Sequence, residues 1–142
     1  DFYPGKSELL RDGTDVCLMA AGMMVNESLK AAAILQERGI SASVLNLRSI
    51  KPLDVECVSA LAGRTRAVVV AEDHNRYGGA GSAVAGALAA TCPVPMEQVA
   101  LEDTFAESGR ADLLLKKYGL TADHICQSAI RAMERRDRIY AG

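Results

Sequence analysis

Short apolar runs alternate along the chain with longer segments whose apolar residues recur at helical spacing. The apolar runs predict strands, because they are short and are bounded by polar or turn-forming residues. These runs cover residues 15–21, 42–47, 67–71 and 98–101. Apolar runs without strict alternation are typical of parallel strands that helices cover on both faces. The order of strands and helices therefore predicts an α/β domain with three layers, α/β/α.

The segments with helical spacing carry recognisable start and stop signals. They predict helices from residue 25 to a stop at residue 39, from residue 54 onward, over 83–90, over 110–118 and from residue 121 onward. Asp54, Ser82 and Thr121 are residue types that cap helix N-termini. Gly39 suits the left-handed position that often follows the end of a helix.

The length of the chain predicts a single domain over residues 1–142, since a domain usually holds about 100 to 200 residues. Residues 1–10 are expected to form an edge strand, a tail or the end of a linker. Residues 137–142 are expected to form a tail. The chain begins at Asp1 rather than at a methionine, which favours a fragment of a longer protein.

The composition argues against several classes of partner. The chain carries a formal net charge of −2, which favours neither nucleic acid nor an anionic membrane. No stretch approaches the ~18 consecutive apolar residues of a membrane span. The four cysteines lie far apart in sequence, so the paired spacing of zinc and redox sites is absent. We therefore expect a cytoplasmic protein that binds neither nucleic acid nor a membrane.

A glycine-rich loop follows the third predicted strand. Residues 72–86 read EDHNRYGGAGSAVAG, so the loop lies between a strand and a helix. Ligands of α/β proteins bind beyond the carboxyl ends of the strands, and helix N-termini favour anions. This reading predicts a small-anion or regulatory site formed by Gly78, Gly79, Gly81, Ser82 and His74.

Other features of the same loop favour a purely structural turn. The dinucleotide fingerprint G-x-G-x-x-G would begin at Gly79, but its third place holds Val84. The loop also has no lysine, which a Walker A phosphate loop requires. Small residues after the loop would allow the helix to pack closely on its neighbours. Both readings stay open, and the structural turn is the favoured one.

The acidic and histidine side chains beside this loop do not form an evident catalytic group. Glu72, Asp73 and His74 could serve as an acid–base set. Neighbouring residues of a strand point to opposite faces, however, so these three need not converge. The other histidine, His124, falls in the first turn of a helix and is expected at the surface. We therefore predict no catalytic residue and no metal site in this chain.

Four stretches, in this order along the chain, resemble the C-terminal domain of transketolases. They read DVCLMAAGMMVNESLKAAAILQERGI, VLNLRSIKPLD, EDHNRYGGAGSAVAGAL and FAESGRADLLLKKYGLTADHI. The last stretch is similar to transketolase proper through Phe105, Glu107, Ser108 and Gly109, followed by KYGLT. Related domains occur in deoxyxylulose-phosphate synthases and in the beta subunits of 2-oxoacid dehydrogenases. The resemblance extends from about Phe2 to Ala132.

This resemblance implies a fold and a cofactor. The fold would be a three-layer α/β/α domain with a mixed, mostly parallel five-stranded sheet, whose antiparallel strand residues 6–10 could supply. Complete enzymes of this kind use thiamine diphosphate and a divalent metal, Mg²⁺ or Ca²⁺. They move a two-carbon ketol unit between sugar phosphates in the pentose phosphate pathway, and a homodimer is expected.

The resemblance also implies what this chain lacks. Thiamine diphosphate binds between two other domains, one with a G-D-G motif and a downstream asparagine, the other with an activating glutamate. The only similar triplet here is the D-G-T of RDGTD, whose order differs. No cofactor-binding residue is therefore carried over, and the chain alone is predicted to be inactive. It would be an accessory domain whose partner domains lie on the same or a separate chain. The alternative is a free-standing anion- or partner-binding module that uses residues 78–82.

Overall fold

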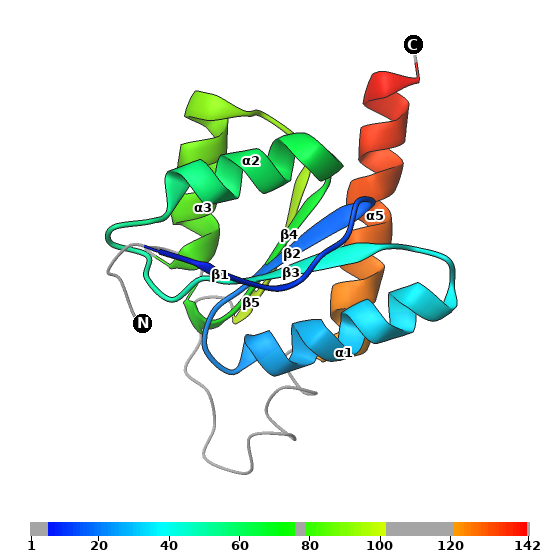
Figure 1. Ribbon diagram of the computed structural model, residues 1–142, viewed down its shortest axis with the longest axis horizontal. Helices are drawn as coiled ribbons and strands as arrows, with labels where there is room; N and C mark the ends of the chain where they lie inside the picture. Colours follow the sequence, from blue (N-terminus) through cyan, green and yellow to red (C-terminus); the bar gives the residue numbers. More distant parts are fainter. Residues whose placement is uncertain (1–5, 76–78, 102–120, 142) are drawn as a thin grey trace.

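The computed structural model describes residues 6–75, 79–101 and 121–141. Five strands and four helices lie in these residues (Figure 1). The strands are β1 (Glu8–Arg11), β2 (Val16–Ala20), β3 (Ala42–Asn46), β4 (Val68–Asn75) and β5 (Met96–Leu101). The helices are α1 (Met24–Glu37), α2 (Val55–Thr65), α3 (Ala80–Thr91) and α5 (Ala122–Tyr140). The predicted loop 105–109 and helix 110–118 lie outside the described residues.

The strands form one mixed sheet in the order β1-β3-β2-β4-β5. Strand β1 is antiparallel to β3, while the β2–β3, β2–β4 and β4–β5 pairs are parallel. The central strand β2 places Leu18 beside Val44 of β3 and Val69 of β4. The predicted five-stranded, mostly parallel sheet is confirmed, and Glu8–Arg11 form its antiparallel edge strand.

Each face of the sheet is covered by a pair of helices. Side chains of β2 alternate, so Leu18 belongs to a core cluster with α1 and α5, and Met19 to a cluster with α2 and α3. Figure 1 shows the two helix pairs on opposite sides of the sheet. Because both faces are buried, the strands carry apolar residues at successive positions, and all five residues of β2 are buried. The predicted three-layer architecture is confirmed.

Helix α2 begins as the sequence predicts. Asp54 is its N-cap, and the Asp54 carboxylate accepts a hydrogen bond from the backbone N–H of Cys57 at 3.2 Å. The same carboxylate accepts a 2.8 Å bond from the N–H of Ser7, just before β1. The buried Asp54 side chain therefore caps α2 and also binds the segment that leads into β1.

The start of α3 and the capping bond of α5 differ from the prediction. Helix α3 begins at Ala80 with Gly79 as its N-cap, three residues before the start expected from Ser82. Thr121 does occupy the N-cap of α5, but its side chain makes no capping bond, and its hydroxyl lies 2.6 Å from Nδ1 of His124. In both helices a carboxylate from another element satisfies the first N–H groups instead.

The tail predicted for residues 137–142 is also corrected, because α5 continues to Tyr140. Arg136, one turn before the helix end, donates hydrogen bonds to the carbonyls of Asp15 and Thr65. The guanidinium of Arg66 stacks on the Tyr140 ring, 4.6 Å from its centroid. These contacts hold the last turns of the helix. No described helix is long and apolar enough to span a bilayer.

Candidate functional site

The junction between β4 and α3 contains a buried carboxylate. Glu72 of β4 is only 1% exposed. Its carboxylate oxygens accept hydrogen bonds from the backbone N–H groups of Ala80, at 2.5 Å, and Gly81, at 3.0 Å. A helix N-terminus carries partial positive charge and free N–H donors, and it attracts anions. The anion at this helix start is therefore a side chain of the protein itself.

Gly81 has a packing reason to be glycine. A Cβ atom at this position would lie 2.8 Å from Cδ of Gln98 on β5. The absence of a side chain thus lets the first turn of α3 approach the neighbouring strand closely. The residue fits the structural reading of the loop, in which small residues allow tight packing of α3.

The predicted anion site is only partly visible. Gly79 and Gly81 are buried, and Ser82 is exposed on the first turn of α3. Gly78 and the side chain of His74 lie outside what the structure describes. An anion site at these five residues therefore stays a prediction. The Glu72 carboxylate argues against it, because an added anion would compete with a charged group already bound to the same donors.

Glu72 and Asp73 diverge, as expected of neighbours on a strand. Glu72 binds the start of α3, whereas Asp73 lies at the start of α1 on the other face of the sheet. The Asp73 carboxylate accepts a long, 3.4 Å bond from the N–H of Met23, and a Cβ at Gly22 would lie 2.7 Å from Asp73 Oδ1. Gly22 also has a φ of +64°, a value that favours glycine. The two carboxylates do not form an acid–base pair.

A carboxylate stands at the N-terminus of every helix in the described part of the chain. Beyond Glu72 at α3 and Asp73 at α1, Asp54 caps α2, and Glu27 of α1 accepts a 3.1 Å bond from the N–H of Ala122 at α5. Three of these four carboxylates come from another element, so no local capping motif reveals them. The pattern stabilises the layers by joining helix starts to their neighbours.

Three of the four cysteines have thiols of lowered reactivity. Burial raises the pKa of the Cys17 thiol to about 12, and burial also raises the pKa values of Cys57 and Cys126. A thiol with a raised pKa is poorly ionised at neutral pH and is a weak nucleophile. Among the described residues, no group of three or more His, Cys, Asp and Glu side chains is placed to hold a metal ion.

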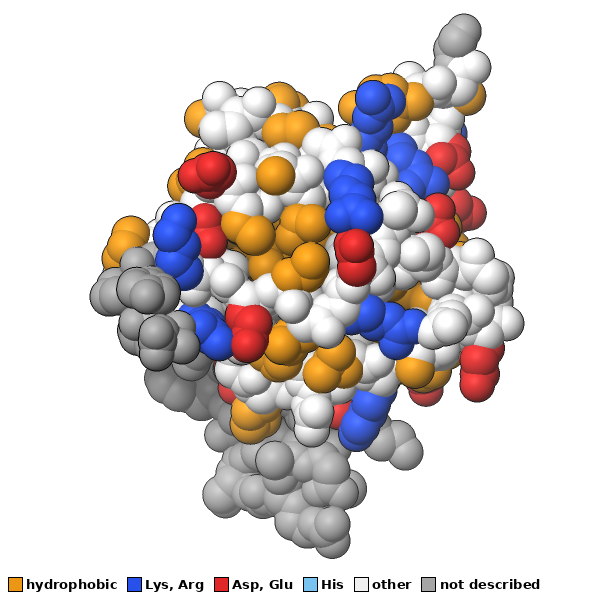
Figure 2. Space-filling view, viewed as in Figure 1, with side chains coloured by type: hydrophobic (Ala, Val, Ile, Leu, Met, Phe, Trp, Pro, Cys, Tyr) orange, Lys and Arg blue, Asp and Glu red, His pale blue; other side chains and the backbone are white. Residues whose placement is uncertain are grey.

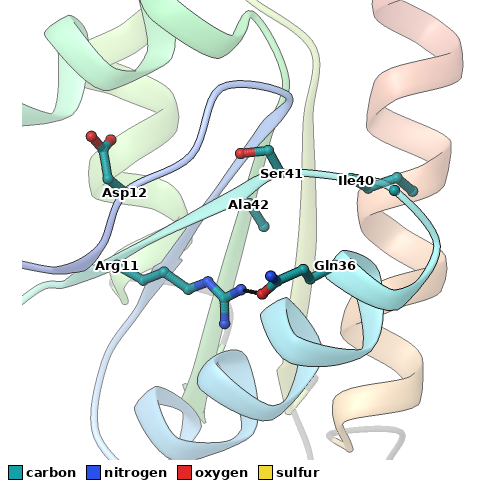
Figure 3. Close-up of a pocket in the computed structure, with 7 residues that line it drawn as sticks. Arg11, Asp12, Gln36, Ile40, Ser41 and Ala42 are labelled. Atoms are coloured by element: carbon teal, nitrogen blue, oxygen red, sulfur yellow. Dashed lines mark hydrogen bonds between the residues drawn. The ribbon is translucent and has the colours of Figure 1, made fainter.

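A surface pocket of about 380 Å³ lies between the end of β1 and the end of α1. Figure 3 shows the Arg11 side chain crossing this pocket to a hydrogen bond with Gln36, with Ser41 and Ala42 of the next segment behind it. The pocket sits at the amino end of β3. Ligands of open α/β sheets bind at the opposite, carboxyl end of the strands. The pocket therefore lies at the end of the sheet opposite to the usual ligand site of this fold class.

The chain matches the model of a known protein family. The family model described as the C-terminal domain of transketolase matches residues 5–125. This chain belongs to the transketolase C-terminal domain family. The predicted resemblance is thus confirmed over most of the chain.

Two relatives are similar to this chain over nearly its whole length. The chain is 46% identical over 137 residues to the 6-deoxy-6-sulfo-D-fructose transketolase subunit SqwH of Clostridium sp. (strain MSTE9), covering 96% of this chain and 42% of that protein. It is 43% identical to the 1-deoxy-D-xylulose-5-phosphate synthase of Desulforudis audaxviator (strain MP104C), with coverage of 95% and 22%.

One solved structure is similar throughout. It is described as a split-gene transketolase in an inactive beta4 tetramer, and it matches with a TM-score of 0.91 and 41% identity. The match covers 95% of this chain and 44% of that one. The transketolase C-terminal domain described here thus spans less than half the length of these relatives.

Proposed function

We propose that this chain is the accessory C-terminal module of a transketolase-type enzyme that moves a two-carbon ketol unit between sugar phosphates. The observation that carries the proposal is the family match over residues 5–125, combined with coverage of only 42% of a transketolase subunit. The chemistry would take place in the remaining domains. The module would contribute packing and stability, and would be inactive by itself.

The described residues do not fit a thiamine diphosphate site. Their helix N-termini, which could otherwise bind a diphosphate, hold the protein's own carboxylates, including Glu72 and Asp54. A diphosphate placed beside Glu72 would meet a buried negative charge, which is costly without a compensating cation. The cofactor and its divalent metal, Mg²⁺ or Ca²⁺, are therefore assigned to partner domains.

The partner domains would lie on the same chain or on a second one. Relatives described as transketolase subunits, and a split-gene transketolase described as a tetramer, support an enzyme assembled from several chains. We propose a homodimer of the complete catalytic unit, acting in the sugar-phosphate metabolism of the cytoplasm. The donor and acceptor sugars would be selected outside this module.

Isolation of the native protein tests this proposal. An antibody to this chain is used to purify the protein from the source organism, and mass spectrometry identifies what is recovered. We expect polypeptide sequence with the G-D-G motif, continuous with this chain or in stoichiometric amount, and ketol transfer that requires thiamine diphosphate. A lone product near 15 kDa with no such companion would contradict the proposal.

A further inference from the structure

An apolar groove lies between the end of α3 and the end of α5. It consists of two hollows beside the connection from α3 to β5, and Pro93 and Val94 line both of them. We name this pair of hollows the Pro93 groove. The α5 hollow, of about 260 Å³, is also lined by Pro95, Arg135, Ile139 and Tyr140. The α3 hollow, of about 190 Å³, is also lined by Ala85, Leu88, Ala89 and Met96.

Two large apolar side chains of this groove are open to solvent. Ile139 and Tyr140 are 62% and 49% exposed, more than any other large hydrophobic residue in the described part of the chain. Figure 1 shows the ends of α3 and α5 on the same, upper side of the molecule. Exposed apolar surface with charged residues around it is typical of an interaction site.

The walls of the Pro93 groove are held in place. Arg135 donates hydrogen bonds to the Met96 carbonyl at 3.1 Å and to the Glu97 carboxylate at 2.6 Å, which ties α5 to β5. Arg66 has a φ of +59°, a backbone conformation that few residues other than glycine adopt. Its guanidinium stacks on the Tyr140 ring, 4.6 Å from the centroid. Because these walls are preorganised, little conformational entropy is lost when a partner binds between them.

The groove has an excess of positive charge. The last ten residues of α5 carry four arginines and two carboxylates. Arg131 and Arg135 share a single carboxylate, that of Glu97, at 3.2 and 2.6 Å. Among the described residues, no carboxylate pairs with Arg66 or Arg138. The whole chain carries a formal net charge of −2, so the charge at this groove is opposite in sign to that of the molecule.

Apolar hollows beside unpaired guanidinium groups indicate the chemistry of the occupant. Figure 2 shows hydrophobic and basic side chains next to each other over the end of α5. Tyrosine and arginine are enriched in protein interfaces, and guanidinium groups bind carboxylates strongly. We propose that the Pro93 groove binds an acidic, apolar peptide segment of a partner protein. One apolar side chain of the segment would enter each hollow, and its carboxylates would pair with Arg66 and Arg138.

The shape of the groove favours a peptide over a lipid surface. A cavity of about 150 Å³ accommodates a benzene ring, so each of the two larger hollows has room for one side chain. The surface of a bilayer would not fill two separate hollows. The Met96 carbonyl, at the start of β5, already accepts a hydrogen bond from Arg135. The bound segment would therefore be recognised through its side chains rather than as an added strand of the sheet.

Peptide selection on the native protein tests this proposal. The protein is purified from the source organism with the chains that accompany it, and a phage library of random dodecapeptides is selected on it. We expect the enriched peptides to combine Asp or Glu with at least two large apolar residues. Their affinity, measured by fluorescence anisotropy, should fall as the salt concentration rises. No enrichment, or enrichment of basic peptides, would overturn the proposal.

Variants of the same protein locate the binding surface. Ile139→Glu and Arg138→Glu should each weaken binding of the enriched peptides by about ten-fold or more. Leu9→Glu is the matched control, because Leu9 is 45% exposed on β1, at the opposite edge of the sheet, and it should leave the affinity unchanged. Circular dichroism checks that all three variants fold. Binding that neither Ile139→Glu nor Arg138→Glu weakens would overturn the proposal.

Two further measurements address other occupants of the groove. Cosedimentation uses vesicles of phosphatidylcholine and phosphatidylserine in equal amounts, and analytical ultracentrifugation follows self-association. We expect no vesicle binding, and the same oligomeric state for the wild-type protein and Ile139→Glu. Vesicle binding that Ile139→Glu abolishes would assign the groove to a membrane surface. An oligomer that this variant dissociates would assign it to a second copy, and either result would overturn the proposed occupant.

Discussion

The first N–H groups of α2 and α3 need hydrogen-bond acceptors, and the two helices obtain them from different parts of the chain. Both present free N–H groups that a carboxylate satisfies. At α2 the carboxylate is Asp54, the residue at the N-cap itself. At α3 it is Glu72, which belongs to the preceding strand and lies eight residues before Ala80. The first device is local and visible in the sequence, whereas the second exists only once β4 and α3 are packed together.

The distant origin of the carboxylate at α3 explains why the sequence of the glycine loop suggests a ligand site. A loop without a capping side chain leaves donors that an external anion could bind. Here a buried glutamate from the strand occupies that position. A glycine-rich strand-to-helix loop should therefore be examined for an acidic residue near the end of its strand before a phosphate is assigned to it.

Removal of the Glu72 carboxylate should cause the largest loss of stability among the changes at these helix starts. Glu72→Ala leaves two buried N–H groups without their charged acceptor, and we expect a loss of about 3 kcal/mol in the free energy of unfolding. Urea denaturation measures this loss. Glu72→Gln is the matched control, because it keeps an acceptor oxygen and should lose less. A loss below about 1 kcal/mol for Glu72→Ala would show that the carboxylate is not an important cap.

The local cap should contribute less to stability. Asp54→Ala removes the bond to Cys57 and the bond to Ser7, and we expect it to cost about 1 to 2 kcal/mol. Asp54→Asn keeps one acceptor and should cost only part of that, as judged by the same urea titration. A larger loss of stability for Asp54→Ala than for Glu72→Ala would contradict the expectation that the carboxylate from β4 contributes more than the local cap.

The packing at Gly81 should have an effect of about 1 kcal/mol. A Cβ here would contact the end of the Gln98 side chain, which must move aside. Gly81→Ala is therefore expected to lower the unfolding free energy, and Gln98→Ala in the same chain should recover most of the loss. Thermal unfolding of the two single variants and the double variant measures this coupling. If the changes in unfolding free energy of the two single variants simply add in the double variant, the two residues do not compete for the same space.

The smallest expected effect concerns an anion at the emptied cap. In Glu72→Ala, formate could occupy the position of the missing carboxylate and raise stability by less than about 1 kcal/mol. The wild-type protein, whose cap is filled, should respond to formate no more than to chloride at equal ionic strength. An equal response of both proteins would mean that the α3 start does not form a specific carboxylate site.

Much of the fold could be predicted from the sequence. The apolar runs located β2, β3, β4 and β5, and Asp54 located α2, because these signals are local. The sequence places the start of α3 too late, because the carboxylate at this start comes from β4. It also places the end of α5 too early, because distant elements hold Arg136 and Tyr140. The cap at Ala122 was missed for the same reason, since Glu27 lies 95 residues away in sequence.

We propose that this module supports a transketolase without binding its cofactor. Isothermal titration calorimetry tests it most directly. The 142-residue chain is titrated with thiamine diphosphate in the presence of Mg²⁺, and with inorganic phosphate as a simpler anion. We expect no saturable heat in either titration, whereas the complete enzyme should bind the cofactor. Saturable, stoichiometric binding of thiamine diphosphate to the isolated chain would contradict it.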